Sequence, residues 1–156
     1  LIYIAIVFSV LVLDRTSKII ILNILENVGT VDIYINSFLN LYLVWNKGIG
    51  FGLFAFNQDY IYNGITLLIF LINLIIVYLI FKEKSPRTYF LAIILGGSLG
   101  NLFDRYYYNA VPDFIDLNYN GYHWFIFNVA DIFITLGIIC LILAEFFNYK
   151  KENDKK

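Results

Sequence analysis

The feature that most constrains this chain is a set of four apolar segments, each close to the ~20 residues that a helix needs to cross a bilayer. The segments cover approximately residues 1–25, 61–81, 89–108 and 124–147, and a polar turn at residues 14–18 interrupts the first. With 60% hydrophobic and 15% charged residues, the composition excludes an ordinary soluble domain. We therefore predict a single-domain α-helical integral membrane protein with four transmembrane helices.

The distribution of basic residues predicts which ends of the segments face the cytoplasm. Lys82, Lys84 and Arg87 follow the second segment, and four lysines lie in the C-terminal tail, whereas residues 26–60 hold only Lys47. Cytoplasmic loops of membrane proteins carry an excess of lysine and arginine. Both termini are therefore predicted to be cytoplasmic, which puts the connection after the third segment near the outer face. We expect a loop or a helix in that connection.

The region after the first segment reads differently from a membrane helix. Residues 31–45 alternate β-branched, aromatic and polar side chains, a pattern that favours short external strands. With the residues that follow, they form a predicted β-rich cradle over about 31–54. Residues 46–52 read NKGIGFG, and the three glycines suit a plain turn and a loop lining a groove for an extended peptide equally well.

Several classes of function find no support in the composition. A formal net charge of -1 gives no basic face for nucleic acid. Cys140 is the single cysteine and lies in an apolar run, so it is expected to be a small buried hydrophobe. His123 is the single histidine and stands beside Trp124, which favours an aromatic belt at the membrane surface. We predict no metal site and no cofactor.

Four acids, Asp104, Asp113, Asp116 and Asp131, lie in or between the last two segments, which are apolar enough for a bilayer. Ionisable groups in such a place are costly and usually functional. If the external connection folds back over the helix ends, Asp113 can meet Asp131 near the membrane surface. Two close carboxyl groups share a proton, so one can activate water as a base while the other acts as an acid. Asp116 is expected to cap or end a helix.

Two further polar groups share helix faces. Asp14 and Lys18 stand four residues apart, so they can form an ion pair across one helical turn. Asn101, Asp104 and Arg105 also lie on one face. We predict that Asp104 and Arg105 brace the site electrostatically and that Asp104 does not react, because an acid beside arginine tends to stay ionised.

The residues alone leave rival functions open. The first is a proton- or cation-coupled transporter subunit in which Asp104, Asp113 and Asp131 form a relay. The second is a non-catalytic assembly factor whose acids only pair with Arg105. A relay would be expected to put acids at mid-bilayer depth in several helices, whereas the second segment offers only neutral polar residues.

Five motifs occur in order along the chain: LDRTSK, NKGIGFG, GNLFDR, VPDFID and FNVAD. With these motifs the sequence resembles the lipoprotein signal peptidase family, the bacterial signal peptidases II, over nearly its whole length. The resemblance implies an aspartic endopeptidase that cuts bacterial prolipoproteins just before a cysteine carrying a diacylglyceryl group. It also implies a place in the bacterial inner membrane, among membrane lipids. We expect a monomer.

The resemblance also assigns roles to residues. The catalytic pair falls on Asp113 and Asp131. Residues that match those positioning the substrate or supporting the site in the family are Asp14, Lys18, Asn46, Gly48, Asn101, Asp104, Arg105 and Asn128. The chain departs from the family pattern at Ile49, Gly50, Pro112 and Phe125. None of these departures removes an acid or an amide.

Overall fold

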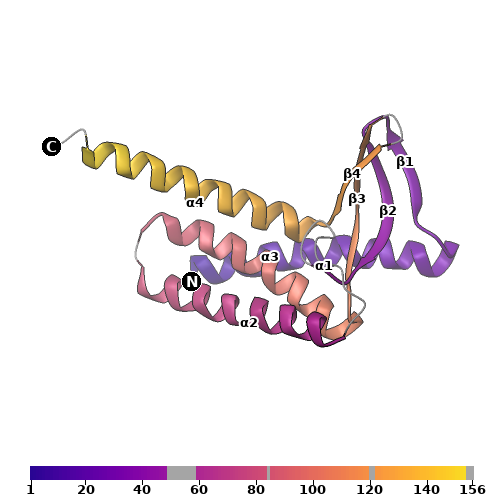
Figure 1. Ribbon diagram of the computed structural model, residues 1–156, viewed down its shortest axis with the longest axis horizontal. Helices are drawn as coiled ribbons and strands as arrows, with labels where there is room; N and C mark the ends of the chain where they lie inside the picture. Colours follow the sequence, from indigo (N-terminus) through magenta and orange to yellow (C-terminus); the bar gives the residue numbers. More distant parts are fainter. Residues whose placement is uncertain (49–58, 84, 120–121, 154–156) are drawn as a thin grey trace.

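The computed structural model describes residues 1–48, 59–83, 85–119 and 122–153, which form four helices and a four-stranded antiparallel sheet. The elements are α1 (Ile2–Val28), β1 (Asp32–Asn36), β2 (Leu39–Asn46), α2 (Asp59–Lys82), α3 (Arg87–Tyr108), β3 (Val111–Tyr119), β4 (Tyr122–Phe127) and α4 (Val129–Asn153). The helices lie roughly along the longest axis, and the sheet stands across one end of them (Figure 1). Residues 49–54 of the predicted cradle, with the departures at Ile49 and Gly50, lie outside the described residues.

Two of the described helices are long and apolar enough to cross a membrane. They are Tyr60–Lys82 in α2 and Val129–Phe147 in α4, with mean hydropathies of 2.8 and 2.3. Most of their surface is not buried within the protein, as expected for helices that face lipid. In α1 and α3 charged residues interrupt the apolar sequence, and these two helices do not meet the same criterion.

Helix α1 continues through the polar residues 14–18 without a break, as the predicted pairing of Asp14 with Lys18 across one helical turn requires. Asp14 and Lys18 face each other across one turn, with 2.9 Å between the carboxylate and the ammonium. This pairing lets the charged residues remain helical inside an otherwise apolar segment. The helix ends at Gly29, whose positive φ of 84° suits a residue without a side chain.

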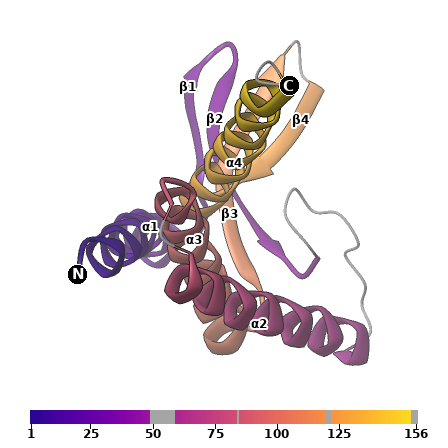
Figure 2. The same cartoon turned by 90° about the vertical axis from the view of Figure 1, so that its left-hand side faces the viewer.

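Helix α3 lies in the middle of the bundle, with α1, α2 and α4 around it (Figure 2). Its glycines permit the close packing that membrane helices need. A β-carbon at Gly96 would come within 2.8 Å of the Val10 side chain of α1. One at Gly97 would come within 2.7 Å of the Ala130 carbonyl oxygen of α4. Because these glycines have no side chain, α1 and α4 can approach α3 closely, and the polar residues of all three helices can meet.

The sheet has the strand order β1-β2-β3-β4 and confirms the strands expected in residues 31–45. The connection between the third and fourth segments is also part of this sheet, so the predicted loop or helix is wrong. Residues 124–127, predicted to begin the fourth span, belong to strand β4. They are apolar and aromatic, and they continue directly into the apolar sequence of α4, so hydropathy alone could not separate strand from helix.

Packing between α1 and the sheet fixes where the sheet lies. A buried apolar cluster joins Ile21 of α1, Phe114 of β3 and Val31, which directly precedes β1. Val129 at the start of α4 packs against this cluster. Strand β3 pairs with β2 on one side and with β4 on the other. As a result, the first residues of β3 lie beside the end of β2 and the first turn of α4.

Candidate active site

Asp113 and Asp131 both lie where the sheet meets the helices. Asp113 is in β3 and is 2% exposed, and Asp131 is in the first turn of α4 and is 7% exposed. With a fourth span predicted over 124–147, Asp131 would lie about two turns into its helix, but α4 begins only at Val129. The late start of α4 moves this acid to the helix end, next to β3.

Asn128 connects the two acids. Its side-chain amide donates a hydrogen bond to Asp113 Oδ1 at 2.6 Å, and its backbone N–H donates to Asp131 Oδ2 at 3.2 Å. In return, the backbone N–H of Asp131 donates to Asn128 Oδ1 at 3.2 Å. This reciprocal arrangement is a capping box at the start of α4. The spacing of Asn128 and Asp131 in the sequence carries the signal for this capping box.

A side chain on the neighbouring strand β2 also donates a hydrogen bond to Asp113. Asn46, at the end of β2, donates its amide N–H to Asp113 Oδ2 at 2.8 Å. The backbone N–H of Gly48 donates in turn to Asn46 Oδ1 at 2.7 Å. Arg105 of α3 donates through Nη2 to the carbonyl oxygen of Gly48. Both oxygens of Asp113 therefore accept hydrogen bonds from residues predicted to support the site.

Asp131 is held from the helix side. Asn101 of α3 donates its amide N–H to Asp131 Oδ1 at 2.8 Å, and the Lys18 ammonium donates to Asn101 Oδ1 at 2.9 Å. Lys18 also donates to Asp14 at 2.9 Å and to Asp104 Oδ2 at 2.6 Å. Asp14 also accepts a 3.0 Å hydrogen bond from the backbone N–H of Ala130 at the start of α4. The residues singled out from the sequence thus form one connected network.

Asp104 and Arg105, predicted to brace the site together, have different partners and do not pair with each other. Asp104 accepts hydrogen bonds from Lys18 and from Arg15, both on α1. Arg105 faces another way, towards Gly48 and the ring of Tyr62 on α2. Neighbouring residues on a helix point ~100° apart, so two neighbours can share a broad polar face and still contact different helices. Sequence analysis missed Arg15, the residue after Asp14.

Asp116 contributes to the sheet and does not cap a helix. It is fully buried in β3, and its Oδ2 lies 2.7 Å from Nδ1 of His123 in β4. His123, expected only in an aromatic belt, therefore has a specific polar partner. Within the described part of the chain, no three histidine, cysteine, aspartate or glutamate side chains gather in a way that could hold a metal ion.

Burial changes the acidity of Asp113. The pKa of its carboxyl group rises from 3.8 to about 7, first because burial penalises the charged form and second because Asp131 places a negative charge nearby. Hydrogen bonds from Asn128 and Asn46 oppose this rise. One member of the pair can therefore keep its proton at neutral pH. Such a pair can offer a base and an acid in the same place.

The raised pKa of Asp113 predicts how stability depends on pH. Between pH 3.8 and about 7 the folded protein binds protons at this group that the unfolded chain releases. The stability that this group contributes is therefore complete at acidic pH and is lost as the pH rises through this window. The slope approaches about 1.4 kcal/mol per pH unit.

Thermal unfolding in detergent micelles measures this effect. In the wild-type protein the melting temperature should fall as the pH rises towards 7, because the stability that protonated Asp113 contributes is lost. In Asp113→Asn this part of the pH dependence of the melting temperature should disappear. Asp116→Asn, in the same strand, is the matched control and should retain it. An identical slope in the wild type and in Asp113→Asn would contradict the raised pKa.

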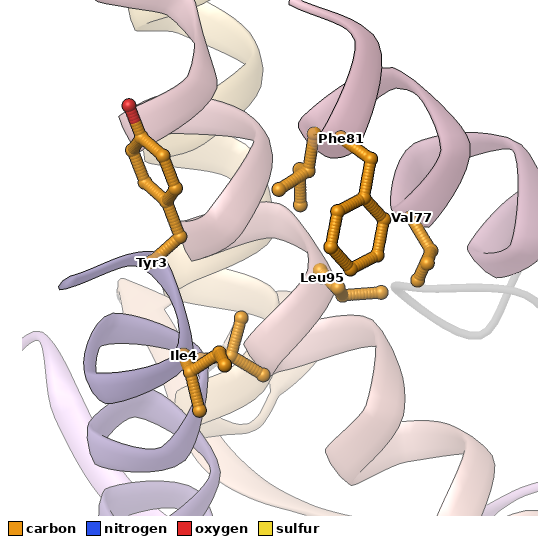
Figure 3. Close-up of a pocket in the computed structure, with 7 residues that line it drawn as sticks. Tyr3, Ile4, Val77, Phe81 and Leu95 are labelled. Atoms are coloured by element: carbon orange, nitrogen blue, oxygen red, sulfur yellow. The ribbon is translucent and has the colours of Figure 1, made fainter. Parts of the chain in front are cut away.

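Apolar cavities lie away from these acids. One of about 180 Å³ is lined by α1, α2 and α3, with Tyr3, Ile4, Val77, Phe81 and Leu95 around it (Figure 3). Another, of about 640 Å³, lies between the same three helices, closer to Asn63 and Tyr106. Neither is lined by Asp113, Asp131 or the residues that hold them.

Comparisons with known proteins give one consistent result. Residues 6–147 match the family described as Signal peptidase (SPase) II. The chain is 56% identical over 151 residues to the lipoprotein signal peptidase of Pelagibacter ubique (strain HTCC1062), covering 96% of this chain and 91% of the relative. It is 41% identical over 140 residues to that of Anaplasma phagocytophilum (strain HZ), covering 87% and 86%.

Solved structures agree with the sequence matches. A bacterial membrane enzyme determined by the in meso method at 2.3 Å resolution superimposes with a TM-score of 0.78 at 27% identity, covering 99% of this chain and 91% of that one. A second, at 1.9 Å resolution, gives a TM-score of 0.73 at 28% identity, covering 91% and 90%.

Proposed function

Because the chain belongs to the signal peptidase (SPase) II family, we propose that it is an aspartic endopeptidase with Asp113 and Asp131 as its catalytic residues. Its substrate is a prolipoprotein whose cysteine carries a diacylglyceryl group, and the bond cut is the one before that cysteine. Relatives that are 56% and 41% identical to the chain are named lipoprotein signal peptidases, which favours the peptidase over the transporter relay and over the non-catalytic assembly factor.

One observation carries the aspartic mechanism: two buried carboxyl groups meet through Asn128, and Asp113 has a pKa of about 7. The ionised member accepts a proton from water while the water oxygen bonds to the scissile carbonyl carbon. The protonated member gives its proton to the carbonyl oxygen. The proton taken from water then passes to the amide nitrogen, and the C–N bond breaks. The new carboxyl group returns a proton, so the pair again holds one.

The surrounding residues keep this geometry. Asn46 and Asn128 donate to opposite oxygens of Asp113, so they fix the plane of its carboxyl group. Asn101 fixes Asp131 and is itself held by the Lys18 ammonium. Arg105 holds the carbonyl oxygen of Gly48, and the N–H of Gly48 in turn holds Asn46 in place beside Asp113. Each role is a positioning role, because none of these side chains needs to exchange a proton.

The proposed placement in the membrane follows from the same architecture. All four helices cross the bilayer, both termini are cytoplasmic, and the sheet lies at the outer face of the bacterial inner membrane as part of one monomeric domain. Polar residues of α1 and α3 face each other inside the bundle, which makes their membrane crossing feasible. Strand β3, which holds Asp113, and the start of α4, which holds Asp131, lie at the end of the helices where the sheet stands (Figure 1), so acyl chains can stay in the bilayer during cleavage.

Cleavage of matched precursors by the purified protein tests the proposal. A prolipoprotein carrying diacylglyceryl on its cysteine should be cut before that residue, whereas the same precursor without the lipid should remain uncut or react at least about a hundred-fold more slowly. The acyl chains anchor the scissile bond at the depth of the acids, and this anchoring contributes to orientation. Equal cleavage of both precursors would contradict the proposed substrate.

A further inference from the structure

Arg15 is a charged residue in α1 to which neither the sequence nor the comparisons assign a role. Its side chain is 15% exposed. Nη2 donates a hydrogen bond to Asp104 Oδ1 and lies 3.4 Å from Asp14 Oδ2. The guanidinium group stacks over the ring of Phe103, 4.8 Å from its centre. These contacts hold the charge of Arg15 against two buried acids instead of leaving it in solvent or at the lipid surface.

The buried cluster needs this second positive charge. Asp14, Asp104 and Lys18 are all fully buried, and their formal charges sum to -1. An ammonium group has three hydrogens, and Lys18 directs its own to Asp14, Asp104 and Asn101. Lys18 alone therefore cannot balance both carboxylates, and the guanidinium of Arg15 brings the cluster to neutrality.

We propose that Arg15 is a positioning residue for the reaction, because it neutralises Asp104 and so keeps negative charge away from the catalytic pair. The link runs from Lys18 through Asn101 to Asp131. The inference rests on the proposed aspartic mechanism. An unbalanced negative charge at this distance would make the pair hold its protons more tightly, so activity would need a higher pH.

Other charged groups also lie near the catalytic pair. Those on the elements packed against the pair are Asp14 and Lys18 of α1, Asp104 and Arg105 of α3, Asp116 of β3 and His123 of β4. Since Asp116 and His123 pair with each other and Arg105 faces Gly48, a change at Arg15 is transmitted chiefly through the Asp14, Lys18 and Asp104 cluster.

The test is the pH dependence of kcat/KM for cleavage of the lipid-modified precursor in detergent micelles. Arg15→Gln should move both limbs of the profile to higher pH by about one unit, the shift expected for one unbalanced charge in a partly buried site. Arg15→Lys keeps the charge and should restore most of the wild-type profile. Arg87→Gln, which alters an ion pair with Glu83 and Glu145, is the control and should leave the profile unmoved.

Asp104→Asn supplies an independent variant if Arg15→Gln folds poorly. It leaves the cluster with one excess positive charge, so the profile should move to lower pH. The double variant Arg15→Gln/Asp104→Asn is neutral again and should return to the wild-type position. Lower activity with unmoved limbs in both single variants would overturn the inference. Retained activity in Asp113→Asn and Asp131→Asn, measured in the same assay, would instead overturn the aspartic mechanism.

Discussion

Asp113→Asn and Asp131→Asn should each lower kcat for prolipoprotein cleavage by at least about a thousand-fold, while the protein still folds. Asparagine has nearly the shape of aspartate, but it can neither take a proton from water nor give one to a carbonyl oxygen. In either variant one carboxyl group remains, so no pair is left to share a proton. The losses should therefore be similar in size, and the double variant should lose little more than either single one.

The matched control for this prediction is Asp116→Asn. Asp116 is as buried as Asp113 and lies three residues further along the same strand, but it contacts His123 in place of the catalytic pair. It should keep activity within a few-fold of the wild type. Comparable circular dichroism and thermal unfolding of the variants would show that folding is intact. Substantial cleavage by Asp113→Asn or Asp131→Asn would rule out the carboxyl pair as the catalytic centre.

Helix positions could be predicted from hydropathy because apolar length is a strong signal. The second and third predicted segments, 61–81 and 89–108, agree closely with α2 (Asp59–Lys82) and α3 (Arg87–Tyr108). The start of α4 was harder to predict, since the strand before it is also apolar. The capping box of Asn128 and Asp131 marks this boundary. Local capping chemistry therefore locates the helix start where hydropathy does not.

The partners of the site residues depend on contacts between elements. Asp14 and Lys18 could be paired from their spacing, because both residues belong to one helix. The pairing of Asp104 could not, because it depends on how α3 is rotated against α1. The close approach at Gly96 fixes that rotation, and it brings Arg15 of α1 to Asp104. Sequence neighbours such as Asp104 and Arg105 then serve different parts of the site.

Lys18→Met should cause a large loss of stability, about 3–5 kcal/mol, because it removes one partner from a buried ion pair. Lys18 is fully buried and donates hydrogen bonds to Asp14, Asn101 and Asp104. Methionine fills a similar volume but leaves the two carboxylates with only Arg15 to balance them. It also releases Asn101, so Asp131 loses its fixed orientation and kcat should fall as well.

A second substitution separates the charge effect from packing. In Lys18→Met/Asp104→Asn the remaining charges of the cluster, Asp14 and Arg15, cancel, so a measurable part of the lost stability should return even though two native residues are missing. Activity should not return, because Asn101 still lacks its ammonium partner. Lys82→Met, in the last turn of α2, is the control for losing a lysine and should unfold like the wild type. If the double variant were no more stable than Lys18→Met, charge balance would not be what holds α1 against α3, and the neutral cluster inferred around Arg15 would lose its physical basis.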